Sequence, residues 1–207
     1  MSDDYKIILR GLLQFLFGAV LSVAAFKFYV WSGRHPLPIE SWMEIAQEAM
    51  LLTAALFFAA AARRAPRLRG GLILVAGFLF SMLIREFDGY FDLIVHGFWK
   101  YVLLVFLCFV AFGVVRAGRE TVVPGLAHFI ASRSFVFMLT GCVLVLVYSR
   151  LFGMKGLWEF FSSACTGWQG AKTFSEESTE VLGYTFMFTS GISYLRELAA
   201  EKRQQPN

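Results

Sequence analysis

The sequence is poor in the residues on which soluble enzymes and disulfide-stabilised domains depend. Of its 207 residues only 16% are charged, whereas a soluble domain usually has about 25% charged residues. Three cysteines are too few for a disulfide framework or a four-thiolate zinc site. The sequence also contains no Gly-x-Ser-x-Gly, Cys-x-x-Cys, His-Glu-x-x-His or phosphate-loop motif, so the common signatures of hydrolases, dithiol redox enzymes, zinc proteases and nucleotide-binding proteins are missing.

Apolar residues are in excess. Hydrophobic residues make up 57% of the chain, 23 residues are Phe, and the mean hydropathy is +0.61. This composition excludes a disordered chain, a nucleic-acid-binding domain and an ordinary cytosolic enzyme. It indicates an all-α integral membrane protein that forms one transmembrane domain over residues 1–207, with the lipid bilayer as its main partner and no nucleic acid.

The apolar runs predict about six transmembrane helices in a single bundle. A helix needs about 20 residues to cross roughly 30 Å of hydrocarbon. The segments that meet this requirement, with their polar ends included, are residues 8–31, 39–62, 70–87, 91–115, 134–152 and 177–198. Between the fifth and sixth segments, Trp and Phe alternate with small polar residues, which favours a short interfacial or re-entrant helix, or else an extracytoplasmic loop with aromatic anchors.

The basic residues predict the orientation of the bundle. The connection at residues 63–69 contains four arginines, and short loops rich in Lys and Arg stay in the cytoplasm. With six spans, this places both termini in the cytoplasm of a protein of the inner or plasma membrane. Most of the other basic residues then also lie on the cytoplasmic side.

The acidic residues are concentrated at the opposite, outer ends of three predicted helix elements. Their spacing is helical: Glu44 and Glu48 are four residues apart, as are Asp88, Asp92, His96 and Lys100, and Glu180 and Tyr184. Residues four apart share one face of a helix. Because a charge near mid-membrane costs a few kcal/mol or more unless it finds a partner or water, we expect these side chains to face one another and not lipid.

The sequence therefore predicts one polar cavity that opens to the outer face. Its expected centre is Glu48, Glu86, Asp92, His96 and Glu180, and its expected flanks are Glu44, Arg85, Asp88, Lys100, Glu177 and Tyr184.

Three interpretations of this cluster stay open. In the first it is architectural, with Arg85, Lys100 and Lys172 pairing with the acids and joining three helices. In the second it holds a divalent metal ion, with Asp92 and His96 as ligands from one helical face. In the third its carboxylates form a proton or cation pathway.

The functions that correspond to these interpretations belong to different classes. We expect most of all a small protein of cation- or proton-coupled transport. The alternatives are a metal-dependent membrane enzyme that acts on a lipid or lipid-linked substrate at the outer leaflet, and a non-catalytic accessory or assembly subunit. A bundle of 207 residues is thin for enclosing a pathway by itself. We therefore expect a homodimer or a partner membrane subunit.

Overall fold

The computed structural model describes residues 42–161 and 168–204, together with isolated positions between residues 12 and 34. The described residues form helices and turns, with no strand among them. The predicted span 8–31 lies largely outside the described residues.

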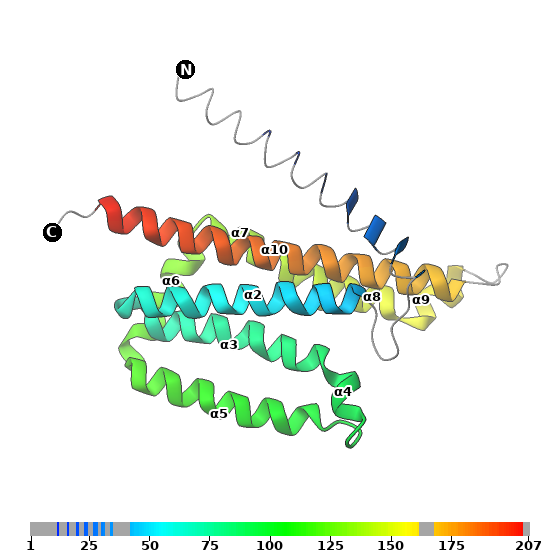
Figure 1. Ribbon diagram of the computed structural model, residues 1–207, viewed down its shortest axis with the longest axis horizontal. Coiled ribbons are helices and arrows are strands. Elements are labelled where there is room, and N and C mark those ends of the chain that lie inside the picture. Colours follow the sequence, from blue (N-terminus) through cyan, green and yellow to red (C-terminus); the bar gives the residue numbers. More distant parts are fainter. Residues whose placement is uncertain are drawn as a thin grey trace.

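The structure contains four helical segments that are long and apolar enough to cross a membrane. They are α2 (Trp42–Arg64), α3 (Arg69–Glu86) with the preceding η1 (Pro66–Leu68), α5 (Trp99–Ala117), and the rod formed by α7 (Ser134–Val143), the π-helical η3 (Leu144–Tyr148) and α8 (Ser149–Gly153). Figure 1 shows α2, α3 and α5 side by side and the α7 rod beside α10, with consecutive candidate spans running in opposite directions. The expected count of six spans stays a prediction.

The last helix is the longest in the described chain. α10 (Trp168–Gln204) has 37 residues, which correspond to about 55 Å of helix, and the predicted span 177–198 lies within it. It runs beside α2 and the α7 rod and packs against both. It is not among the four candidate spans, because it is less apolar than they are.

Short helices connect the rods. They are α4 (Asp88–Asp92), η2 (Arg119–Thr121), α6 (Val122–Ala131) and α9 (Lys155–Phe161). α9 lies in the stretch where the sequence favours an interfacial or re-entrant helix, but neither placement is established by the structure.

The hydrophobic core lies between α2, α3 and α10 and continues onto α6 and the α7 rod. Its aromatic part lies where α2, α6 and α10 meet. The rings of Phe58 and Tyr194 stack with centroids 5.6 Å apart, and Phe129 contacts both rings edge-on. All three side chains are almost completely buried. Aromatic pairs in these geometries stabilise a core beyond the area they bury, so this cluster fixes α10 against the rest of the bundle.

One part of the expected helix pattern is wrong. The stripe Asp88, Asp92, His96 and Lys100 requires one continuous helix, but α4 ends at Asp92 and α5 begins only at Trp99. The Gly97 backbone has a φ of +80° and its N–H donates to the Asp92 carboxylate at 2.8 Å. An Asp side chain that accepts a nearby backbone N–H competes with the helical hydrogen bond, and glycine readily takes the positive φ that follows.

The charges divide the bundle into two ends. The starts of α2 and α10, the ends of α3 and α8, and the short helix α4 lie at one end, which we call the acidic end. The opposite end is the basic end. Basic side chains at the latter come from the α2–α3 connection, the α5–α6 connection and the end of α10. They are Arg63, Arg64, Arg67, Arg69, Arg116, Arg119, Lys202 and Arg203.

Candidate functional site: a carboxylate cavity

A polar cavity of about 220 Å³ lies at the acidic end of the bundle. It is lined by the carboxylates of Glu44, Glu48, Glu86, Asp88, Glu176, Glu177 and Glu180, by Arg85 and Arg150, and by Gln47. Carboxylates thus outnumber arginines in the lining. This excess of negative charge is the main chemical property of the site.

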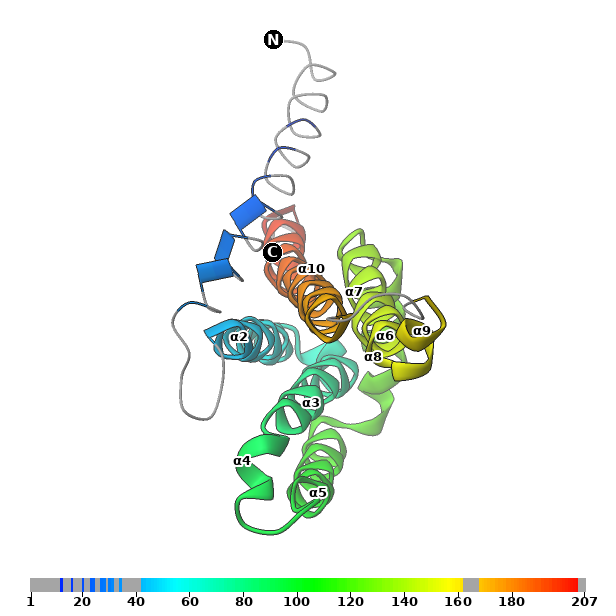
Figure 2. The same cartoon turned by 90° about the vertical axis from the view of Figure 1, so that its right-hand side faces the viewer.

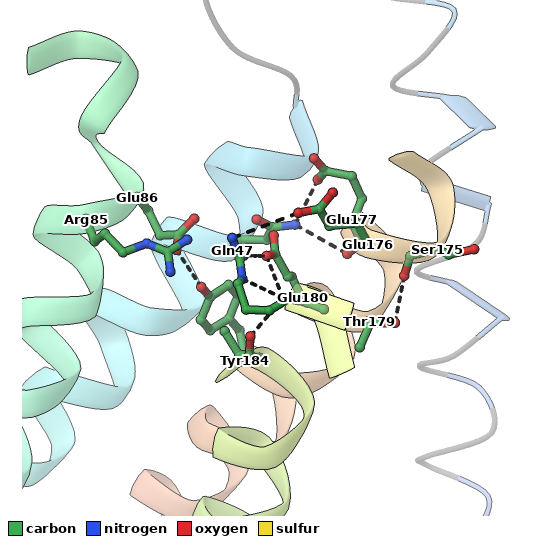
Figure 3. A network of polar contacts seen from close by, with 12 residues as sticks. Gln47, Arg85, Glu86, Ser175, Glu176, Glu177, Thr179, Glu180 and Tyr184 are labelled. Carbon is green, nitrogen blue, oxygen red and sulfur yellow. Dashed lines mark hydrogen bonds and ion pairs between the residues drawn. The ribbon is translucent and has the colours of Figure 1, made fainter. Parts of the chain in front are cut away.

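Three segments of chain that are far apart in sequence supply most of the lining. On α2, Glu44, Gln47 and Glu48 are three and four residues apart and therefore share one helical face. Glu177 and Glu180 have the same relation on α10. Figure 3 shows side chains of α2, of the end of α3 and of the start of α10 pointing toward one another. The cavity therefore depends on the packing of α2 against both α3 and α10.

Arg150 is the principal cation on the α10 side. Its guanidinium pairs with Glu180 and lies 3.9 Å from the Glu176 carboxylate. The Ser149 hydroxyl donates to Glu180 at 2.9 Å, and Lys172 Nζ lies 3.0 Å from Glu176. The Glu180 side chain is only 7% exposed, so these contacts replace the water that a buried carboxylate would otherwise need.

Two further contacts join α10 to α2 and α3. The buried Gln47 amide donates to the Glu177 carboxylate at 3.1 Å. The Tyr184 hydroxyl donates to Glu86 Oε1 at 2.8 Å, and Arg85 lies 3.4 Å from the same oxygen. Tyr184 is fully buried, so its hydroxyl forms the floor of this polar region.

The structure brings some of the predicted residues together and leaves others apart. Glu48, Glu86 and Glu180 line the cavity, as do the predicted flanking residues Glu44, Arg85, Asp88 and Glu177. Tyr184 contacts it through Glu86. Asp92, His96 and Lys100 are not part of its lining.

Asp92 and His96 instead form a pair on the surface. Asp92 Oδ2 lies 2.8 Å from His96 Nδ1, and the His96 side chain is 96% exposed. The hydrogen bond from the Gly97 backbone N–H, with a further contribution from His96, holds the pKa of Asp92 below its usual value of 3.8. Both contacts of Asp92, with the His96 ring and with the Gly97 backbone, are local contacts within the loop between α4 and α5.

The predicted set lacks three residues of the lining, which are Glu176, Arg150 and Gln47. Glu176 lies four residues before Glu180, on the same face of α10. Arg150 lies at the end of the predicted span 134–152, at the same membrane level as Glu180, and a search for cations at that level would have found it. Gln47 is neutral and carries no charge signal, although it lies between Glu44 and Glu48 on the same face of α2.

A cavity rich in carboxylates has a definite chemical capacity. Neighbouring carboxylates repel one another when all are ionised, and a proton or a bound cation relieves that repulsion. Oxygen ligands of this kind suit hard cations. Within the described residues, no group of three or more His, Cys, Asp or Glu side chains has the arrangement of a metal site.

Comparison with known proteins gives no relative for this chain. No family model, no curated protein and no solved structure matches it. The structure itself supports an all-helical chain with several apolar helices that are compatible with a membrane protein.

Proposed function

We propose that this chain is a small membrane transport protein whose carboxylate cavity takes up protons or a cation during transport. The observation that carries the proposal is the composition of the cavity, in which seven carboxylates and two arginines line one space of about 220 Å³. Ionisable side chains in helices that face the interior of a membrane bundle commonly mark proton and ion pathways.

The charge balance favours this function over a purely architectural role. Ion pairs that only join helices need about as many cations as anions, because each unpaired charge is costly to desolvate. Arg85, Arg150 and Lys172, which pairs with Glu176, are too few for the seven carboxylates around the cavity. A site that binds and releases a positive charge accounts for the excess, since the bound proton or cation supplies the missing charge.

The orientation is part of the proposal. The basic end would face the cytoplasm of an inner or plasma membrane, because basic connections are retained on that side. The carboxylate cavity would then open toward the outer side and accept its proton or cation from there.

The proposal is tested by flux measurements on the full-length protein in liposomes with a pH-sensitive dye inside. We expect a proton flux driven by an outer acid pulse, and we expect Glu48→Gln and Glu180→Gln each to reduce it at least about tenfold, because a positioned proton acceptor typically contributes a factor of that size or more. Asp92→Asn is the matched control, since it neutralises a carboxylate at the same end that does not line the cavity.

Three outcomes would contradict the proposal. They are no flux under any cation or pH gradient, an equal loss in Asp92→Asn and Glu48→Gln, and a flux that Glu48→Gln leaves unchanged. A stoichiometric transition metal that His96→Ala removes would favour the membrane-enzyme alternative. Absence of flux with a second membrane protein that co-purifies would favour the accessory subunit.

A further inference from the structure

A second cavity, of about 400 Å³, lies toward the basic end of the bundle and has a different character. It is formed by α2, α3 and α5, and almost all of its lining is apolar. The lining includes small residues of α2 and α3, among them Ala59, Ala76 and Gly77, which leave space between the helices. Phe80 and Phe106 bound the cavity toward the middle of the bundle. The two phenylalanine rings stack with centroids 5.0 Å apart.

The cavity is an elongated groove along α3. Arg69, Ile73, Ala76 and Phe80 follow one another at three- and four-residue spacing, so they line one face of that helix. From Arg69 to Phe80 this face is about 16 Å long. α3 packs against both α2 and α5, and Figure 2 shows α2 and α5 on different sides of it. The groove is therefore bounded by helix surfaces at the level of the hydrocarbon.

The groove carries a charge of one sign at one end. Arg63 and Arg69 belong to its lining, and no Asp or Glu does. Arg69 Nε donates to the Ala62 carbonyl at 3.2 Å, which fixes the guanidinium where α2 ends and α3 begins. Helix ends in a membrane lie at the headgroup level, so both arginines would meet the phosphates of the adjoining leaflet.

We infer that this groove is a binding site for one anionic glycerophospholipid from the leaflet at the basic end. One acyl chain lies along α3 between α2 and α5, and the phosphate lies between Arg63 and Arg69. The argument is charge complementarity joined to an apolar slot, since guanidinium groups bind phosphate with strong, charge-assisted hydrogen bonds. The inference does not depend on the transport function.

A lipid fits the groove better than a partner helix does. An α-helix with its side chains is about 10 Å across, which is wide for a slot lined by the alanine and glycine residues of α2 and α3. An apolar helix would also bring no negative charge to Arg63 and Arg69. A phospholipid supplies a narrow acyl chain and a phosphate in one molecule.

Native mass spectrometry of the full-length protein, delipidated in detergent, tests the inference. The protein is titrated with phosphatidylglycerol or with phosphatidylcholine of the same acyl chains. We expect one phosphatidylglycerol to bind preferentially, and we expect the double variant Arg63→Gln/Arg69→Gln to weaken its binding about tenfold. Arg64→Gln/Arg67→Gln is the matched control, because it removes the same charge from the same end outside the groove.

A second variant tests the apolar slot independently of the arginines. Ala59→Leu adds three carbons to the hollow and is expected to reduce binding of both lipids. Soluble glycerol phosphate, which has no acyl chain, is expected not to displace the lipid. The inference is overturned if the two lipids bind equally, if both arginine pairs have the same effect, or if Ala59→Leu leaves binding unchanged.

Discussion

Arg150 has a larger role at the residue scale than its partial exposure suggests. It is the cation that contacts both Glu180 and Glu176, and Glu180 is buried. We expect Arg150→Ala to destabilise the protein by about 1–2 kcal/mol. This value is lower than that of a fully buried pair because the Arg150 side chain is 42% exposed. Thermal unfolding in detergent at neutral pH measures the change.

Two comparisons make the Arg150 result specific. Lys155→Ala removes an exposed cation near the same end and is expected to be neutral within about 0.5 kcal/mol. Glu180→Gln added to Arg150→Ala is expected to recover part of the loss, because it removes the buried charge that lacks its partner. An Arg150→Ala variant as stable as the parent would show that Ser149 and water suffice for Glu180.

The Tyr184 hydroxyl makes a separate contribution. It donates to Glu86 from a fully buried position, so Tyr184→Phe removes a donor to a charged group. We expect a loss of about 1–2 kcal/mol in the free energy of unfolding. Tyr148→Phe is the control, because Tyr148 is 49% exposed and its hydroxyl is expected to lie in solvent or headgroups. Equal effects of the two variants would contradict the role of the contact with Glu86.

Acid is expected to open the loop that Asp92 closes. Because the hydrogen bond from Gly97 lowers the pKa of Asp92 below 3.8, the ionised carboxylate stabilises the loop. This stabilisation is fully present above the unfolded pKa and is lost as the pH falls through the lower, folded pKa. Hydrogen exchange at the Gly97 amide measures it, and Asp92→Asn should make that amide exchange faster at neutral pH than in the parent.

At the scale of the elements, glycine pairs set the distance between helices. A Cβ atom at Gly141 on α7 would lie 2.6 Å from the Gly183 carbonyl oxygen on α10. The backbone of α10 cannot move aside as the end of a flexible side chain can. We therefore expect Gly141→Ala to push α7 away from α10 and to lower the free energy of unfolding by about 1–3 kcal/mol. Thermal unfolding in detergent measures this.

The control for this prediction lies in α10 itself. A Cβ atom at Gly170 would meet no other atom within 4 Å, and alanine is the better helix former. Gly170→Ala is therefore expected to be neutral or slightly stabilising. If Gly141→Ala were equally harmless, the close approach of α7 and α10 would not be the contact that holds them.

The sequence predicts a helix well where residues next to its ends mark those ends, and poorly where a contact in the folded chain ends it. The predicted spans 39–62 and 70–87 correspond closely to α2 and α3, because arginines and Pro66 mark the ends of their apolar runs. The break after Asp92 was not predicted, because the four-residue spacing of Asp92, His96 and Lys100 fits a helix equally well. The helix ends there because the Asp92 carboxylate accepts the Gly97 N–H and Gly97 takes a positive φ.

The candidate site shows the same division. Helical spacing places Glu44 with Glu48 on one face, and the shared outer ends of the predicted helices bring Glu86 and Glu180 into the same cavity. The end of the predicted span 134–152 gives the membrane level of Arg150, but its pairing with Glu180 depends on how the α7 rod packs against α10, which is a tertiary contact. Charge counts along the chain therefore predict the acids better than their partners.

At the scale of the whole molecule, the bundle has an acidic end and a basic end, and α10 extends along it between them. The carboxylate cavity lies at the acidic end, and the apolar groove between α2, α3 and α5 lies toward the basic end. A membrane that holds the bundle in one orientation would then offer outside cations to the carboxylates and anionic headgroups to the arginines. The orientation decides from which side the cavity takes its cation and which leaflet supplies the lipid, so it is worth measuring directly.

Cysteine labelling measures this orientation. In a variant whose three native cysteines are replaced by serine, Gly89→Cys reports on the acidic end and Arg67→Cys on the basic end; both residues are exposed. Because arginine-rich connections stay in the cytoplasm, we expect a membrane-impermeant maleimide to label position 89 in intact cells and position 67 only after permeabilisation. The reverse pattern would place the carboxylate cavity inside the cell and would require its cation or proton to come from the cytoplasm.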